Sequence, residues 1–120
     1  MKPKAVFAVM VASAGLVAAC ASSFPPPNNE WAAAQGDVGR AQAGGAPSVP
    51  DARLHLQLAE EDLQKAKALI GTDDDNNRRA LSLTEVARSE AQLALSIGKQ
   101  AEADGQARQA QAELAKAASH

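Results

Sequence analysis

The sequence predicts an all-α protein: a small antiparallel helical hairpin or three-helix bundle, behind a signal peptide and a disordered, proline-rich tether. Within residues 30–103, apolar residues recur at spacings of three and four, the period of an amphipathic helix. Turn-forming stretches rich in Gly, Pro or Asp separate these segments. The chain holds two Phe, one Trp and no Tyr, so Ala and Leu must supply most of a small core.

The N-terminal segment has the layout of a secretory signal. Lys2 and Lys4 precede an almost unbroken apolar run over residues 5–17, which ends in small residues. The run is shorter than the roughly 20 apolar residues that a transmembrane helix needs. We therefore predict that residues 1–19 form a signal peptide.

A lipid-attachment motif ends this run. The stretch VAAC, which comprises Val17, Ala18, Ala19 and Cys20, resembles the lipobox of bacterial lipoproteins: an aliphatic residue, two small residues and a cysteine. The resemblance implies cleavage between Ala19 and Cys20, a diacylglycerol on the Cys20 sulfur and a further acyl chain, such as palmitate, on its amine. Two or more acyl chains anchor a protein stably, whereas a single chain holds it marginally. Cys20 is the only cysteine, so it has no disulfide partner within the chain.

The residues after the cysteine indicate the membrane. In such lipoproteins an aspartate directly after the cysteine favours retention at the inner membrane, but here Ala21 and Ser22 occupy these positions. We expect a lipid anchor at the periplasmic face of the outer membrane of a Gram-negative bacterium. The alternative is an ordinary secreted protein in which the cysteine lies near the cleavage site by chance.

The predicted tether covers residues 20–29 and begins at the lipidated Cys20. Three successive prolines flanked by Ser and Asn favour extended polyproline geometry without a packed core. A tether of this length would keep the domain close to its membrane.

The first helix is predicted from Glu30 to the sequence GGAP at residues 44–47, which ends it. Its narrow apolar stripe consists of Trp31, Ala34, Val38 and Ala41. We expect Trp31 to pack this helix onto the bundle. A ligand-stacking residue and a membrane-interface anchor are the two alternatives.

The second helix is predicted over residues 49–70. In the sequence SVPD, the Ser48 hydroxyl can cap the helix while Asp51 reaches back to the Ser48 amide. Two apolar groups lie on nearly opposite sides of this helix: the first is Ala52, Leu56, Ala59, Leu63, Ala66 and Ile70, and the second is Leu54, Leu58 and Leu69. So wide an arc predicts neighbours on two sides, which would make this helix the central one.

The third helix is predicted after the acidic turn TDDDNN, residues 72–77. Pairs at i, i+4 are expected between Asp74 and Arg78 and between Asp75 and Arg79. The predicted apolar face consists of Leu83, Val86, Ala87, Ala94, Ile97 and Ala101.

Residues 104–120 form an Ala-rich tail whose heptad-like rhythm uses mostly methyl-sized groups. It is either a frayed helical extension, broken near Gly105, or one strand of a weak coiled coil that a partner completes. We favour the first.

From Trp31 to about Ala103 the chain resembles the bacterial family called domain of unknown function 4398 (DUF4398). The matching stretches are GAPSVPDARLHLQLAEEDLQKAKAL and NNRRALSLTEVARSEAQLALSIGKQAEA. The resemblance implies a helical domain over residues 30–103 of a small periplasmic lipoprotein without assigned chemistry.

Charge and residue types argue against several functions. The chain has 12 basic and 14 acidic residues; cleavage after residue 19 removes two lysines and leaves a net charge of −4, which disfavours nucleic-acid binding. The acidic turn lacks the Gly and Glu of an EF-hand loop, and two histidines are too few for a usual zinc site, so we expect no metal and no cofactor. His55 can meet Glu90 in a buried polar contact that fixes helix register. No nucleophile or Gly-rich loop accompanies them, so we expect no catalytic residue.

The expected function is that of a non-enzymatic, lipid-anchored envelope protein, a helical module for interaction or structure. It would contact the membrane through the lipid on Cys20, and an envelope protein or a second copy of itself as a partner. The alternative is a periplasmic carrier of a small ligand or lipid, with the apolar arc of the second helix lining a groove.

Overall fold

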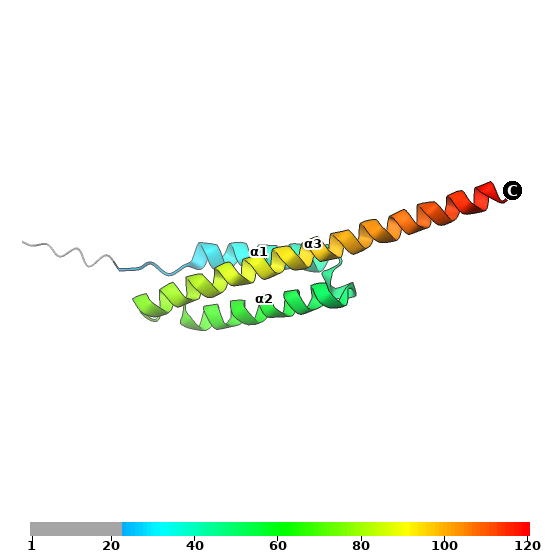
Figure 1. Cartoon of the computed structure of the whole chain (residues 1–120). Coiled ribbons are helices and arrows are strands. Elements are labelled where there is room, and N and C mark those ends of the chain that lie inside the picture. Colours follow the sequence, from blue (N-terminus) through cyan, green and yellow to red (C-terminus); the bar gives the residue numbers. More distant parts are fainter. Residues whose placement is uncertain (1–22) are drawn as a thin grey trace, which may run out of the picture.

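The computed structural model describes residues 23–120, which form three α-helices and one short 3-10 helix (Figure 1). The α-helices are α1 (Asn28–Ala43), α2 (Pro50–Leu69) and α3 (Asp74–Ala118), and η1 (Ala46–Ser48) connects α1 to α2. The helices run side by side, with α1 and α3 in one direction and α2 in the other. The prediction of an all-α helical bundle is confirmed for the described residues.

The central helix of the bundle is α3. It packs extensively against both α1 and α2, whereas α1 and α2 make less contact with each other. The prediction that the second helix is central is therefore wrong. Its first apolar group is buried from Ala52 to Ala66, but in its second group Leu54 and Leu58 are 55% and 40% exposed.

Alanine dominates the core. Ten of the 13 buried apolar residues are alanines; the other three are Val38, Leu56 and Leu63. Because α3 lies against two helices at once, its buried stripe accepts only small or compact side chains: Asn77, Ala80, Thr84, Ala87, Ala91, Ala94 and Gly98. A buried methyl group contributes little area, so close helix contact and the high helix propensity of alanine replace large apolar side chains.

The predicted apolar face of the third helix is correct only in part. Ala87 and Ala94 are buried as expected, but Val86 is 48% exposed. Leu83 and Ile97 are half-buried at the edges of the contact. The periodicity therefore predicts the buried face of α3 to within a fraction of a turn. The larger side chains of the predicted set lie at the edges of this face, and the alanines lie at its centre.

The connection between α1 and α2 crosses α3 at Gly98. A Cβ atom at this position would lie 2.7 Å from the Gly44 carbonyl oxygen and 2.9 Å from the Ala46 nitrogen. Only a residue without a side chain allows these two backbones so close together. Gly45, in the same connection, has a φ of +86°, which glycine adopts without strain.

The ends of α2 differ in detail from the prediction. The capping role of Ser48 is wrong: Ser48 belongs to η1, its amide bonds to the Gly45 carbonyl, and Val49 is the N-cap without a side-chain hydrogen bond. Pro50 occupies the first helical position, where its missing N–H costs nothing. After Leu69 the chain turns through Gly71, whose φ is +80°.

At its start α3 is capped by Asp73, whose carboxylate accepts a 2.8 Å hydrogen bond from the Asn76 amide. Within residues 23–120, neither of the expected i, i+4 aspartate–arginine pairs forms an ion pair. Arg78 instead lies over the Phe24 ring, 5.0 Å from its centroid.

α3 is much longer than the other helices and continues beyond the bundle (Figure 1). Its 45 residues span about 67 Å at about 1.5 Å per residue. The part after Gly98, which we call the overhang, covers residues 99–118 and is helical through Gly105, so the break considered there is absent. Residues 106–120 are exposed throughout. No helix in residues 23–120 combines the length and the apolar character that crossing a membrane requires.

Candidate functional site

The predicted lipid-attachment residues lie next to the described part of the chain. Val17, Ala18, Ala19 and Cys20 fall outside residues 23–120, so the structure does not test them. Phe24, four positions after Cys20, already contacts the bundle. We call this end of the bundle the anchor end; it comprises residues 24–27, the turn 70–73 and the first turn of α3.

The proline-rich segment is part of the folded structure at the anchor end. Pro25, Pro26 and Pro27 lie in a shallow cavity of about 200 Å³ whose wall includes Leu81 of α3. The Pro26 carbonyl accepts a 2.9 Å hydrogen bond from the Asn28 amide, and α1 starts there. The structure thus differs from the expected disordered tether over residues 20–29, because residues 24–29 dock on α3 or belong to α1.

Asn77 joins three segments at the anchor end. Its Nδ2 donates to the Phe24 carbonyl at 3.1 Å, and its Oδ1 accepts from the Gly71 amide at 2.7 Å. The residue is only 4% exposed, so both ends of its amide are satisfied within the protein. Asn77 therefore ties the N-terminal segment and the α2–α3 turn to the start of α3.

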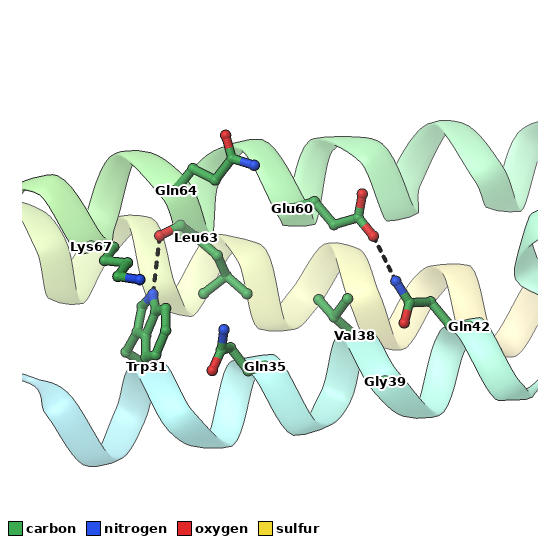
Figure 2. Close-up of a pocket in the computed structure, with 9 residues that line it drawn as sticks. All are labelled: Trp31, Gln35, Val38, Gly39, Gln42, Glu60, Leu63, Gln64 and Lys67. Atoms are coloured by element: carbon green, nitrogen blue, oxygen red, sulfur yellow. Dashed lines mark hydrogen bonds between the residues drawn. The ribbon is translucent and has the colours of Figure 1, made fainter.

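A groove with a volume of about 410 Å³ lies between α1 and α2 (Figure 2). Its lining residues are Trp31, Gln35, Val38, Gly39, Gln42, Glu60, Leu63, Gln64 and Lys67. Most of these side chains end in amide or charged groups. These polar ends lie beside the apolar groups of Trp31, Val38 and Leu63, so the groove offers both kinds of contact to a small ligand.

Trp31 lies at one end of this groove and packs α1 against α2. Its Nε1 donates a 3.0 Å hydrogen bond to the Leu63 carbonyl, and the Lys67 ammonium lies 5.5 Å from the ring centroid (Figure 2). At the other end, Gln42 Nε2 donates to Glu60 Oε1 at 2.8 Å. The expectation that Trp31 packs the first helix onto the bundle is confirmed.

The expected contact between His55 and Glu90 is present. His55 Nδ1 lies 2.5 Å from Glu90 Oε2, and the two side chains are 27% and 26% exposed. The contact joins α2 to α3. Within residues 23–120 neither side chain makes another side-chain hydrogen bond.

Asp37 is a buried polar residue that sequence reasoning missed. Its side chain is 4% exposed, accepts a 3.1 Å hydrogen bond from Arg88 Nε and also pairs with Arg40. The pair with Arg88 connects α1 to α3. The signal was present, because Asp37 lies three residues after Ala34 and four before Ala41 on the apolar stripe.

Sequence reasoning also missed Asn77, which occupies a position in an apolar stripe as Asp37 does. Asn77 lies three residues before Ala80 and seven before Thr84, on the stripe that α3 buries. Polar residues within an apolar period are candidates for buried hydrogen bonds that specify packing.

The search for metal-binding groups and the comparisons with known proteins assign no function to the chain. Across residues 23–120, no three or more His, Cys, Asp or Glu side chains converge in a way that could hold a metal ion. No family model, no curated protein and no solved structure matches the chain. The resemblance to the DUF4398 family stays a prediction.

Proposed function

We propose that this protein is a non-enzymatic, lipid-anchored module of the bacterial cell envelope. In this proposal, Cys20 carries the lipid, the outer membrane of a Gram-negative bacterium holds it, and the helical bundle faces the periplasm. The observation that carries the proposal is the motif VAAC at the end of a charged and then apolar N-terminal segment, with Cys20 as the only cysteine. The DUF4398-like character of the bundle belongs to the same proposal.

The described structure supports the proposal in two ways. Phe24, which contacts the bundle, comes four positions after Cys20, so the folded part would lie next to the lipid. The buried or half-buried polar side chains Asp37, Asn77 and His55 each contact another segment of the bundle. Satisfied polar contacts of this kind rigidify a small core and specify one arrangement of its helices.

The test is the covalent state of Cys20 in cells. Wild-type protein should incorporate labelled palmitate, remain in the membrane fraction after a high-salt wash and show the mass of a diacylglyceryl and an acyl group. The variant Cys20→Ser should lose the label and the acyl mass, whereas the control Ser22→Ala should keep both. An unmodified thiol in the wild-type protein would refute the proposal.

A carrier function is the second candidate, supported by the groove between α1 and α2. The groove borders Trp31, so a bound ligand should change the fluorescence of this single tryptophan. Native mass spectrometry of residues 21–120, purified without detergent, tests the proposal directly. A copurifying small molecule whose loss alters Trp31 emission would favour the carrier; a ligand-free mass would exclude it for that preparation.

A further inference from the structure

We infer that the anchor end of the bundle rests on the lipid headgroups and that α3 stands away from the membrane, with its overhang farthest from the lipid. This inference rests on the proposed lipid at Cys20. It assigns a lipid surface as the partner of the end that contains Phe24, Asn77 and the turn 70–73.

The first step is the reach of the chain. Only Ala21, Ser22 and Ser23 separate Cys20 from Phe24, and four residue steps span at most about 14 Å. A free tether over residues 20–29 would span about twice that distance, at about 3.1 Å per residue. Docking of Phe24 and the prolines on α3 therefore brings the bundle close to the lipid.

The second step is the direction of the helices. Phe24 is held at the start of α3 by the Asn77 side chain and by the Arg78 guanidinium over its ring. Both α1 and α3 begin at this end and run away from it (Figure 1). A helix of about 67 Å that is attached at one end within about 14 Å of the lipid can place its other end far from the membrane.

The third step concerns the long sides of the bundle, which offer little to a membrane. An interfacial helix combines apolar or aromatic groups on one side with Lys and Arg on the other. Leu54 and Leu58 are exposed on α2, but the exposed Glu61 lies on the same side, three positions after Leu58. Val86 and Leu93 are exposed on α3, but Glu90 lies between them in sequence, on the same side of the helix. Leu114 is the only large apolar side chain of the overhang. The charges of the overhang balance: three basic and three acidic residues, namely Lys99, Arg108, Lys116, Glu102, Asp104 and Glu113. Neither side provides the basic surface that anionic headgroups attract.

The charges of the anchor end do not attract anionic lipid either. Contact between this end and the headgroups therefore depends on the covalent attachment at Cys20. The exposed charges at this end are Asp73, Asp74 and Asp75 against Arg78 and Arg79. With three acidic and two basic groups, headgroup contact at this end depends on the short link to Cys20. The orientation should therefore change when that link is lengthened.

The experiment measures energy transfer from two positions to a headgroup-labelled acceptor lipid. Lipidated full-length protein, purified from membranes, is reconstituted in phosphatidylcholine vesicles, in the variants Thr72→Cys and Ser119→Cys. The sulfur of Cys20 is a thioether in this form, so a thiol-reactive donor labels only the introduced cysteine. Both positions are exposed. We expect strong energy transfer from a donor at position 72 and almost no transfer from a donor at position 119.

A second variant tests the cause of the orientation. Inserting about a dozen Gly and Ser residues between Ser22 and Ser23 adds about 20 Å of flexible reach without touching the fold. The difference in transfer between positions 72 and 119 should then shrink. The matched control carries the same insertion after His120 and should keep the wild-type difference.

The outcomes separate the inference from the proposed function. Equal transfer from both positions, with the acyl mass present on Cys20, would mean that the bundle lies flat, and it would overturn the inference alone. A difference that survives the Gly-Ser insertion before Ser23 would overturn the short link as its cause. An acyl mass missing from the wild-type protein would refute the proposed function and the inference together.

Discussion

Replacing Gly98 by alanine should destabilise the bundle, although the same exchange normally stabilises a helix. Alanine is favoured over glycine inside a helix by about 1 kcal/mol. At Gly98, however, the new methyl group would lie 2.7 Å from the Gly44 carbonyl oxygen and 2.9 Å from the Ala46 nitrogen. Both neighbours are backbone atoms, and overpacking of this kind costs typically about 1–3 kcal/mol.

The expected net effect of Gly98→Ala is a loss of about 1–2 kcal/mol in the free energy of unfolding, since two backbone contacts place the clash in the upper part of that range. Gly36→Ala in α1 is the matched control. Gly36 is exposed and helical, and a Cβ there meets nothing within 4 Å. This variant should gain about 1 kcal/mol.

Urea unfolding of residues 21–120, followed by circular dichroism, gives both values. The two variants should shift the midpoint in opposite directions. A Gly98→Ala protein as stable as the Gly36→Ala protein would mean that the connection between α1 and α2 does not approach α3 closely, and the reasoning would fail.

Three further predictions concern the packing and the anchor end. Leu56→Ala should cost about 2–5 kcal/mol of unfolding free energy because Leu56 is buried, while Leu54→Ala, at a site 55% exposed, should stay within about 0.5 kcal/mol in the same urea experiment. Asn77→Ala leaves the Phe24 carbonyl and a turn amide unpaired and should cost about 1–3 kcal/mol; limited proteolysis should then cut near Phe24 first, and an unchanged cleavage pattern would contradict the role of Asn77. A double-mutant cycle of Asp37→Ala and Arg88→Ala should give a coupling energy of about 0.5–3 kcal/mol; additive effects would show that the pair does not join α1 to α3.

Periodicity was sufficient for the fold class and for the buried side of α2. The series from Ala52 to Ala66 lies along one helical stripe and is buried as predicted. Periodicity did not reveal which of the two apolar groups a neighbour covers, so Leu54 and Leu58 suggested a helix packed on their side of α2, where the described bundle leaves them exposed. The choice depends on where α1 packs, and α1 packs mainly on α3.

The anchor end could not be predicted because it depends on a contact between distant residues. Phe24 and Asn77 are 53 positions apart, and three prolines in sequence indicate extended chain whether or not it docks. The cap of α2 failed for a local reason. Ser48 already belongs to the 3-10 turn that starts at Ala46, so Val49 takes the cap position.

The length of α3 sets the order in which its backbone opens. An isolated helix of about 20 residues is only marginally stable in water because helix nucleation is unfavourable. Adding a residue to an existing helix costs little free energy, because each residue fixed gains one hydrogen bond. The bundle therefore acts as the nucleus from which the overhang propagates. Amide hydrogen exchange should slow progressively from Ala118 towards Gly98, and warming should unwind α3 from its C-terminus while the alanine contacts of the bundle stay closed.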